Sequence, residues 1–114
     1  MKPKDIANLM LEKKASNIKI FDVRKITTFT DYFIICDSGS EPQTKALLSH
    51  ILRTLKKNGS RPLSVEGENK LEWVLIDYVS FIVHIFSEEK RSFYDMDRLW
   101  GDAKITSIKE PNEK

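Results

Sequence analysis

The turn Ser38-Gly39-Ser40 is the part of this sequence whose residue types could do chemistry. It separates an apolar run, residues 31–37, from a helical pattern. Small residues at the start of a helix leave backbone N–H groups free to bind a phosphate, and the helix dipole favours its negative charge. Nucleotidyl transfer at such a turn also needs paired carboxylates that hold Mg²⁺. After Ser40 the chain offers Glu41 and then no acid until Glu66, so this pair is missing.

A helix cap explains the same turn without any ligand. Ser40 and Gln43 have the spacing of a capping box, and Pro42 is tolerated in a first helical turn. Asp95 and Asp97 have the spacing of a metal-binding pair, but they lie in a helical pattern, where residues two apart point about 200° from each other. We therefore predict a cap rather than a catalytic turn. An active or degenerate nucleotidyltransferase is the enzymatic alternative.

Other reactive side chains are few. His50 is predicted on the solvent side of a helix, and His84 alternates with Ile82 and Phe86 in a strand, which is typical of a partly buried imidazole. Cys36 is the single cysteine and lies in an apolar strand, which excludes a disulfide framework and a multi-cysteine zinc site. We predict no enzyme activity, no catalytic residue, no cofactor and no metal site.

Hydrophobic periodicity defines the elements that position these residues. Apolar residues at helical spacing predict helices over residues 3–15, from Ser40 to Asn58-Gly59, and after Ser87. β-Branched and aromatic runs predict strands near 18–23, at 31–37 and at 61–66, and two more in a hairpin over residues 73–86. We expect one α+β domain over residues 1–103, with a mixed sheet of about five strands, and a flexible C-terminal tail over residues 104–114.

The hairpin carries the residues that we predict to bind a partner. Alternation places Trp73, Leu75 and Asp77 on one face of its first strand. If that face were core, burying the Asp77 carboxylate among aromatic side chains would be costly unless it were paired. A Trp, a Leu and an acid on a partly exposed face are typical of protein–protein interfaces. The predicted partner-binding residues are Trp73, Leu75, Asp77, Tyr78 and Glu66, and the final helix adds Asp95, Arg98 and Trp100 as further candidates.

Charge is divided unevenly along the chain, although the net charge is only +2. Residues 1–65 carry twelve Lys and Arg against six Asp and Glu, whereas residues 66–102 carry four against nine. An acidic, aromatic segment suits a basic protein partner and repels nucleic acid. The basic half holds an alternative, because a stripe of cations around the second predicted helix could contact RNA. These cations are Lys45, Arg53, Lys56, Lys57 and Arg61.

The bulk composition is that of an ordinary soluble domain. The chain has 114 residues, of which 40% are hydrophobic and 32% are charged. No apolar run reaches the ~18 residues of a membrane-spanning helix, and the N-terminus has no apolar signal core. We expect a cytoplasmic protein.

Three segments carry an ordered set of motifs, namely Thr30–Ser40, Trp73–Phe86 and Glu88–Trp100. Together they resemble the ribosomal silencing factor family (the Iojap, or RsfS, family). The resemblance covers roughly residues 3–103, with the motifs in the same order. Two departures are Val79-Ser80, where the family usually has Gly-Asp, and Met96, where it usually has Leu; Val tolerates a positive φ poorly. The matching residues are Thr30–Ser40, Gln43, Ala46, Glu66-Gly67, Trp73-Val74-Leu75, Asp77-Tyr78, His84, Phe86, Glu88, Arg91, Phe93-Tyr94 and Leu99-Trp100.

This resemblance implies a nucleotidyltransferase-like fold and a translational repressor. Such a protein binds ribosomal protein L-fourteen of the large ribosomal subunit and blocks joining of the small subunit. We expect Trp73 and Leu75 to be the apolar anchors, with Asp77 and Glu66 supplying complementary charge. An RNA-binding ribosome assembly factor is a further alternative. Some family members form homodimers, and an exposed apolar sheet face is compatible with self-association.

Overall fold

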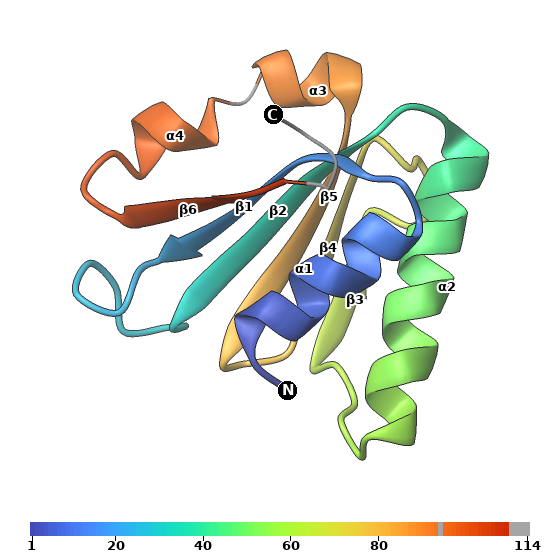
Figure 1. Cartoon of the computed structure of the whole chain (residues 1–114), viewed down its shortest axis with the longest axis horizontal. Coiled ribbons are helices and arrows are strands. Elements are labelled where there is room, and N and C mark those ends of the chain that lie inside the picture. The colour runs from blue at the N-terminus through green and yellow to red at the C-terminus, as the bar shows by residue number, and fades with distance from the viewer. Residues whose placement is uncertain (94, 110–114) are drawn as a thin grey trace.

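A mixed β-sheet with helices on both sides forms the part of the chain that the computed structural model describes, residues 1–93 and 95–109 (Figure 1). Within these residues the sheet has six strands in the order β3-β4-β5-β2-β1-β6. The helices are α1 (Pro3–Glu12), α2 (Glu41–Lys57), α3 (Glu88–Phe93) and α4 (Met96–Leu99). The strands are β1 (Ser16–Asp22), β2 (Tyr32–Ser38), β3 (Ser64–Glu66), β4 (Trp73–Asp77), β5 (Phe81–Ser87) and β6 (Lys104–Ile108).

The central pair, β2 and β5, is parallel, and every other neighbouring pair in the sheet is antiparallel. Both central strands therefore end at the same edge, where Ser38 lies opposite Ser87. Each strand end leads into a helix, α2 after β2 and α3 after β5. The predicted α+β class is confirmed.

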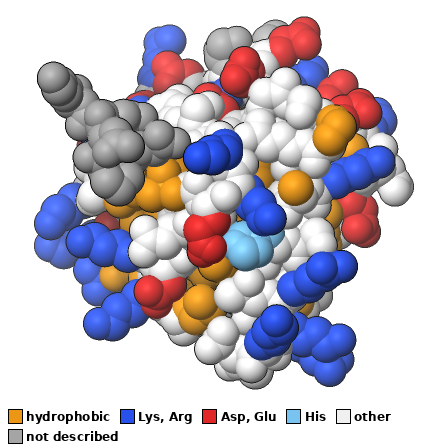
Figure 2. Space-filling model, turned by 45° about the vertical axis from the view of Figure 1, so that its right-hand side comes forward, with side chains coloured by type: hydrophobic (Ala, Val, Ile, Leu, Met, Phe, Trp, Pro, Cys, Tyr) orange, Lys and Arg blue, Asp and Glu red, His pale blue; other side chains and the backbone are white. Residues whose placement is uncertain are grey.

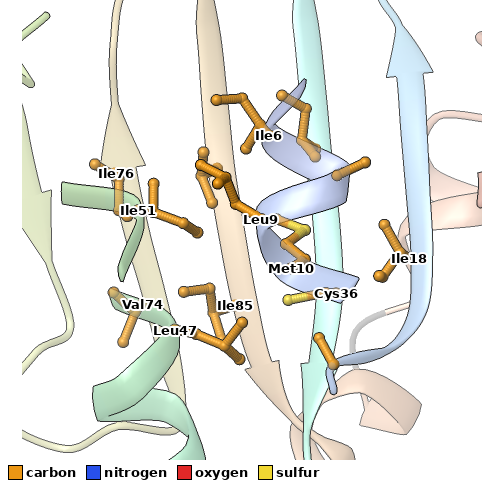
Figure 3. Close-up of a cluster of buried hydrophobic side chains, with 14 of the residues drawn as sticks. Ile6, Leu9, Met10, Ile18, Cys36, Leu47, Ile51, Val74, Ile76 and Ile85 are labelled. Carbon is orange, nitrogen blue, oxygen red and sulfur yellow. The ribbon is translucent and has the colours of Figure 1, made fainter. Parts of the chain in front are cut away.

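Helices α1 and α2 cover one face of the sheet, which we call the helix face (Figure 1). Their apolar sides meet the inward residues of the strands in a cluster of fully or nearly fully buried side chains. Figure 3 shows how these side chains from both helices and four strands point toward one another. The labelled residues are Ile6, Leu9 and Met10 from α1, Leu47 and Ile51 from α2, and Ile18, Cys36, Val74, Ile76 and Ile85 from the sheet. Cys36 is a core thiol, as predicted.

The opposite face, which we call the open face, is only partly covered. A second buried cluster joins Phe21, Phe33 and Phe86 to Met96 of α4, so this short helix lies over the β2, β1 and β6 side. Trp73 and Leu75 pack at the margin of this cluster and are half-buried.

Three expectations differ from the structure. Residues 104–108 form strand β6, which pairs with β1, so the prediction of a flexible tail is wrong for them. Ile105 lies opposite Phe21 and reaches the open-face cluster, and this packing holds the strand. The final helix is divided in two, because the Asp95 carboxylate accepts a hydrogen bond from the Arg98 backbone N–H and caps a new helix. The predicted strand 61–66 is shorter, Ser64–Glu66. Residues 110–114 lie outside the described residues.

No helix in the described part of the chain is both long enough and apolar enough to cross a membrane.

Candidate functional site

The first strand of the hairpin divides its side chains between the two faces, as predicted. Val74 and Ile76 are fully buried on the helix face. Trp73, Leu75 and Asp77 alternate with them and are half-buried on the open face. Half-burial leaves apolar area that a partner could cover, so the prediction of a partly exposed face is confirmed.

Two neighbours hold the Trp73 side chain in place. Its ring is stacked on that of Phe86, with centroids 5.0 Å apart and planes 22° apart. Its indole Nε1–H donates a hydrogen bond to Nδ1 of His84 at 3.0 Å. A tryptophan fixed in this way loses little side-chain entropy when a partner binds it.

His84 is neutral in this arrangement. It is only 4% exposed, and burial lowers its pKa to about 4, with the positive charge of Arg91 acting in the same direction. Because Nδ1 accepts the indole hydrogen, the neutral ring carries its proton on Nε2. The imidazole is more deeply buried than predicted, and its Nε2 has no hydrogen-bond partner among the described residues. The ring acts as a hydrogen-bond acceptor for Trp73.

Aromatic rings continue from Trp73 across the open face. The His84 and Phe33 rings meet edge-on at 5.1 Å, and the Phe33 and Trp100 rings meet edge-on at 4.8 Å. Phe29 then contacts Phe33 at 6.1 Å and Trp100 at 6.5 Å. The structure therefore places Trp100, predicted from the final helix, on the same face as Trp73.

Two exposed side chains were missed by the sequence reasoning, one that contacts this face and one on α4 next to Trp100. Phe29 is 58% exposed and Leu99 is 69% exposed, although both are large and apolar. Phe29 lies in the loop between β1 and β2, where no periodicity marks it; its only signal is an aromatic residue among three threonines. We define the docking surface as Trp73, Leu75, Glu66, Phe29, Leu99 and Trp100.

Glu66 belongs to this surface by strand register. It lies opposite Leu75 in the antiparallel pair β3–β4, and residues directly opposite each other point to the same face. Its side chain is exposed. A hollow of about 450 Å³ beside Trp73, lined by Gly67, Glu72 and Lys90 among others, offers room for a partner side chain.

Asp77 has a structural role in the hairpin turn. Its carboxylate accepts a hydrogen bond from the Val79 backbone N–H at 2.8 Å. Val79 adopts a φ of 72°, a left-handed conformation that a β-branched residue rarely takes, and this bond helps to offset the strain. Contact between Asp77 and a partner stays a prediction.

Tyr78 does not lie on the docking surface. Its side chain is 9% exposed and packs in the helix-face cluster against Phe81, with ring centroids 5.1 Å apart. Burial raises the pKa of its hydroxyl to about 12. Consecutive residues of a strand point to opposite faces, so Tyr78, which follows Asp77, points to the helix face. The prediction that placed Tyr78 with Trp73 in one partner-binding surface did not take this alternation into account.

Asp95 and Arg98 are exposed at the start and the end of α4. The Asp95 carboxylate accepts a hydrogen bond from the Arg98 backbone N–H at 3.2 Å, which is a helix cap and does not involve the Arg98 guanidinium. Asp97, the other half of the apparent acidic pair, forms an ion pair with Lys19. These acids are engaged in separate local contacts rather than aimed at one point.

The turn before α2 is a helix cap. The Gln43 backbone N–H donates to the Ser40 Oγ at 3.2 Å, and the Gly39 N–H donates to the Gln43 Oε1 at 2.7 Å. A Cβ on Gly39 would lie 3.4 Å from a carboxylate oxygen of Glu88. The N–H group that would bind a phosphate is thus occupied, with an acid beside it. Among the described residues, no group of three or more His, Cys, Asp or Glu could hold a metal ion.

Comparisons with known proteins agree with this architecture. The family model described as "Ribosomal silencing factor during starvation" matches residues 2–114. The ribosomal silencing factor RsfS of Bacillus subtilis is 34% identical over 97 residues, which cover 85% of this chain and 82% of that protein. The mouse protein named "Mitochondrial assembly of ribosomal large subunit protein 1" is 26% identical, over 83% of this chain and 43% of that protein.

Solved structures show the same fold. The crystal structure of a protein from Chromobacterium violaceum has a TM-score of 0.78 and 29% identity, and the match covers 99% of this chain and 98% of that one. The family match spans all six strands, including β6, and the residues of the docking surface. The chain belongs to the ribosomal silencing factor family.

Proposed function

We propose that this protein binds ribosomal protein L-fourteen on the large ribosomal subunit through the docking surface and thereby blocks joining of the small subunit. The main support is the open face itself. Trp73 is held rigidly by Phe86 and His84 but left half-exposed, and Phe29 and Leu99 are more exposed still. Aromatic side chains that become buried when a partner binds dominate the binding energy of protein–protein interfaces.

Charge favours a basic protein as the occupant. Glu66 is exposed on the surface. The hollow beside Trp73 is lined by the acids Glu68 and Glu72 and by two lysines, one of which, Lys90, pairs with Glu72, so the hollow adds no net charge. The segment from residue 66 to residue 102 carries nine acids against four cations. Acids around an aromatic centre speed the encounter with a positively charged partner and disfavour direct approach of nucleic acid to this face.

Steric exclusion completes the proposed mechanism, and it requires no catalytic group. The described chain measures 34 × 34 × 30 Å along its principal axes. A body of this size, bound at a site that the small subunit must approach, prevents the two subunits from closing. The relatives named ribosomal silencing factors support this regulatory role over the nucleotidyltransferase alternative.

Titration of purified large subunits with the protein tests this proposal. Trp73→Ala should weaken binding by about 2–4 kcal/mol, because truncation removes an anchor and leaves Phe86 uncovered. Tyr78→Phe is the matched control in the same hairpin, since its hydroxyl has no partner among the described residues and lies on the other face. It should bind like the wild type. Equal affinity of all three proteins would contradict the assigned surface.

A role in large-subunit assembly is a second candidate, which the name of the mouse relative favours. Depletion of the protein separates the two roles. An assembly factor leaves incomplete large subunits when it is lost, whereas a joining inhibitor leaves mature subunits that associate more readily.

A further inference from the structure

The outward side of α2 carries a row of cations that the docking surface does not use. Lys45, Arg53, Lys56 and Lys57 are all exposed, and we call them the cation stripe. The opposite side of the same helix is buried in the helix-face cluster. No ion pair or hydrogen bond joins any of these four side chains to another described residue.

Helix stability explains only half of the cation stripe. Lys56 and Lys57 lie in the last turn, where a cation interacts favourably with the helix dipole. Lys45 and Arg53 lie in earlier turns, where this effect has faded. From Lys45 to Lys56 the stripe extends about 16 Å along the helix, which is long enough to follow several phosphates of a nucleic-acid strand.

Nearby acids do not neutralise the stripe. Glu12 of α1 is engaged by Nε2 of His50 at 3.3 Å. Glu41 lies one turn before Lys45 on the same side of α2, but no ion pair joins the two side chains. It lies at the opposite end of the helix from Lys56 and Lys57. The space-filling view shows Lys and Arg side chains gathered at the lower right without an acidic side chain between them (Figure 2).

The stripe and the docking surface occupy different sides of the molecule. Helix α2 lies against the helix face and toward the β3 edge of the sheet (Figure 1). Trp73 and Leu75 belong to the opposite, open face. The protein therefore presents an acidic, aromatic surface on one side and an unpaired basic row on another. A basic ribosomal protein is surrounded by RNA phosphates, so a domain docked on one meets both kinds of charge.

We propose that the cation stripe binds the phosphate backbone of ribosomal RNA beside the protein docking site. This RNA contact rests on the proposed function, because docking on the ribosomal protein brings the cation stripe to the large subunit. The contact does not depend on base sequence, because lysine and arginine side chains that lack neighbouring aromatic residues bind the phosphates and do not stack on the bases. It adds affinity that depends on salt, and it orients the docked domain.

Salt dependence of binding tests the proposal. The affinity of the full chain for purified large subunits is measured at several salt concentrations between about 50 and 200 mM. A variant with Lys45→Gln, Arg53→Gln, Lys56→Gln and Lys57→Gln should lower the slope of log affinity against log salt by about 3 if all four cations contact phosphates. Circular dichroism checks that the exposed substitutions leave the fold intact.

A matched control removes the same charge elsewhere. Lys13, Lys25, Lys104 and Lys109 are also exposed, and their joint change to Gln gives the same net charge. This control should keep most of the wild-type slope. An unchanged slope in the stripe variant, or an equal fall in the control, would overturn the proposal.

The two sets of variants distinguish a failure of the docking surface from a failure of the RNA contact. If Trp73→Ala binds like the wild type but the stripe variant loses its salt dependence, the protein docking site is wrong and the RNA contact stands. If Trp73→Ala binds weakly and the stripe variant keeps the wild-type slope, the docking site stands and the RNA contact is wrong.

Discussion

His84 sets the orientation of Trp73 at the centre of the docking surface, because its Nδ1 accepts the indole hydrogen. His84→Leu removes the acceptor and should weaken binding to large subunits about five-fold, the effect of one lost hydrogen bond. His84→Asn can place an oxygen near the lost nitrogen and should restore most of the affinity. The indole N–H resonance of Trp73 reports the bond directly: it should shift in the Leu variant and less in the Asn variant. Equal affinity and equal shifts in both would contradict this positioning role.

Burial of His84 also makes the fold sensitive to acid. Its folded pKa of about 4 lies below the ordinary value of 6.5, so the unfolded state takes up the proton first as the pH falls. The free energy of unfolding should therefore be fully retained above pH ~6.5 and decrease by about 2 kcal/mol between pH 7 and pH 5. Urea denaturation of the wild type and of His84→Leu at both pH values measures this. If the variant loses as much stability as the wild type, another group is responsible.

At the scale of elements, the bend between β3 and β4 depends on Gly67. It adopts a φ of +83°, and a Cβ there would lie 1.9 Å from the Trp73 carbonyl oxygen. Gly67→Ala should destabilise the fold by more than about 3 kcal/mol and displace the strand that presents Trp73. Gly59 has the same φ of +83° but nothing within 4 Å of its Cβ position, so Gly59→Ala should cost only about 1 kcal/mol. Chemical denaturation that found equal losses would contradict the steric explanation.

Local sequence patterns predict some of these elements and miss others. The period of two along a strand separates Trp73 and Leu75 from Val74 and Ile76. The cost of burying the Asp77 carboxylate then predicts which of the two faces is partly exposed. Strand β6 was missed because only Ile105 and Ile108 among its five residues are apolar, and its partner β1 is distant in sequence. The break at Asp95 was missed because a helical pattern continues through it, whereas the cap that interrupts it is a local hydrogen bond.

Parts of the site depend on tertiary contacts that no local pattern contains. The hydrogen bond between Trp73 and His84 joins the neighbouring strands β4 and β5. Phe29 reaches the surface from a loop by packing on Phe33 and Trp100. Strand register in the hairpin and packing of the loop fix these contacts, so the sequence predicts candidate anchor residues without their geometry. For Tyr78 the residue type alone was misleading, because a tyrosine is typical of interfaces but this side chain is buried in the core.

At the scale of the whole molecule, the proposed function needs only shape, an anchored surface and sufficient bulk. Its most direct test is sedimentation of equimolar large and small subunits with and without the protein. The proposal predicts that the wild type shifts the joined-ribosome peak to separate subunits and sediments with the large one. Trp73→Ala at the same concentration should leave the peak in place. A joined peak that persists with saturating wild-type protein would contradict the proposed block of subunit joining.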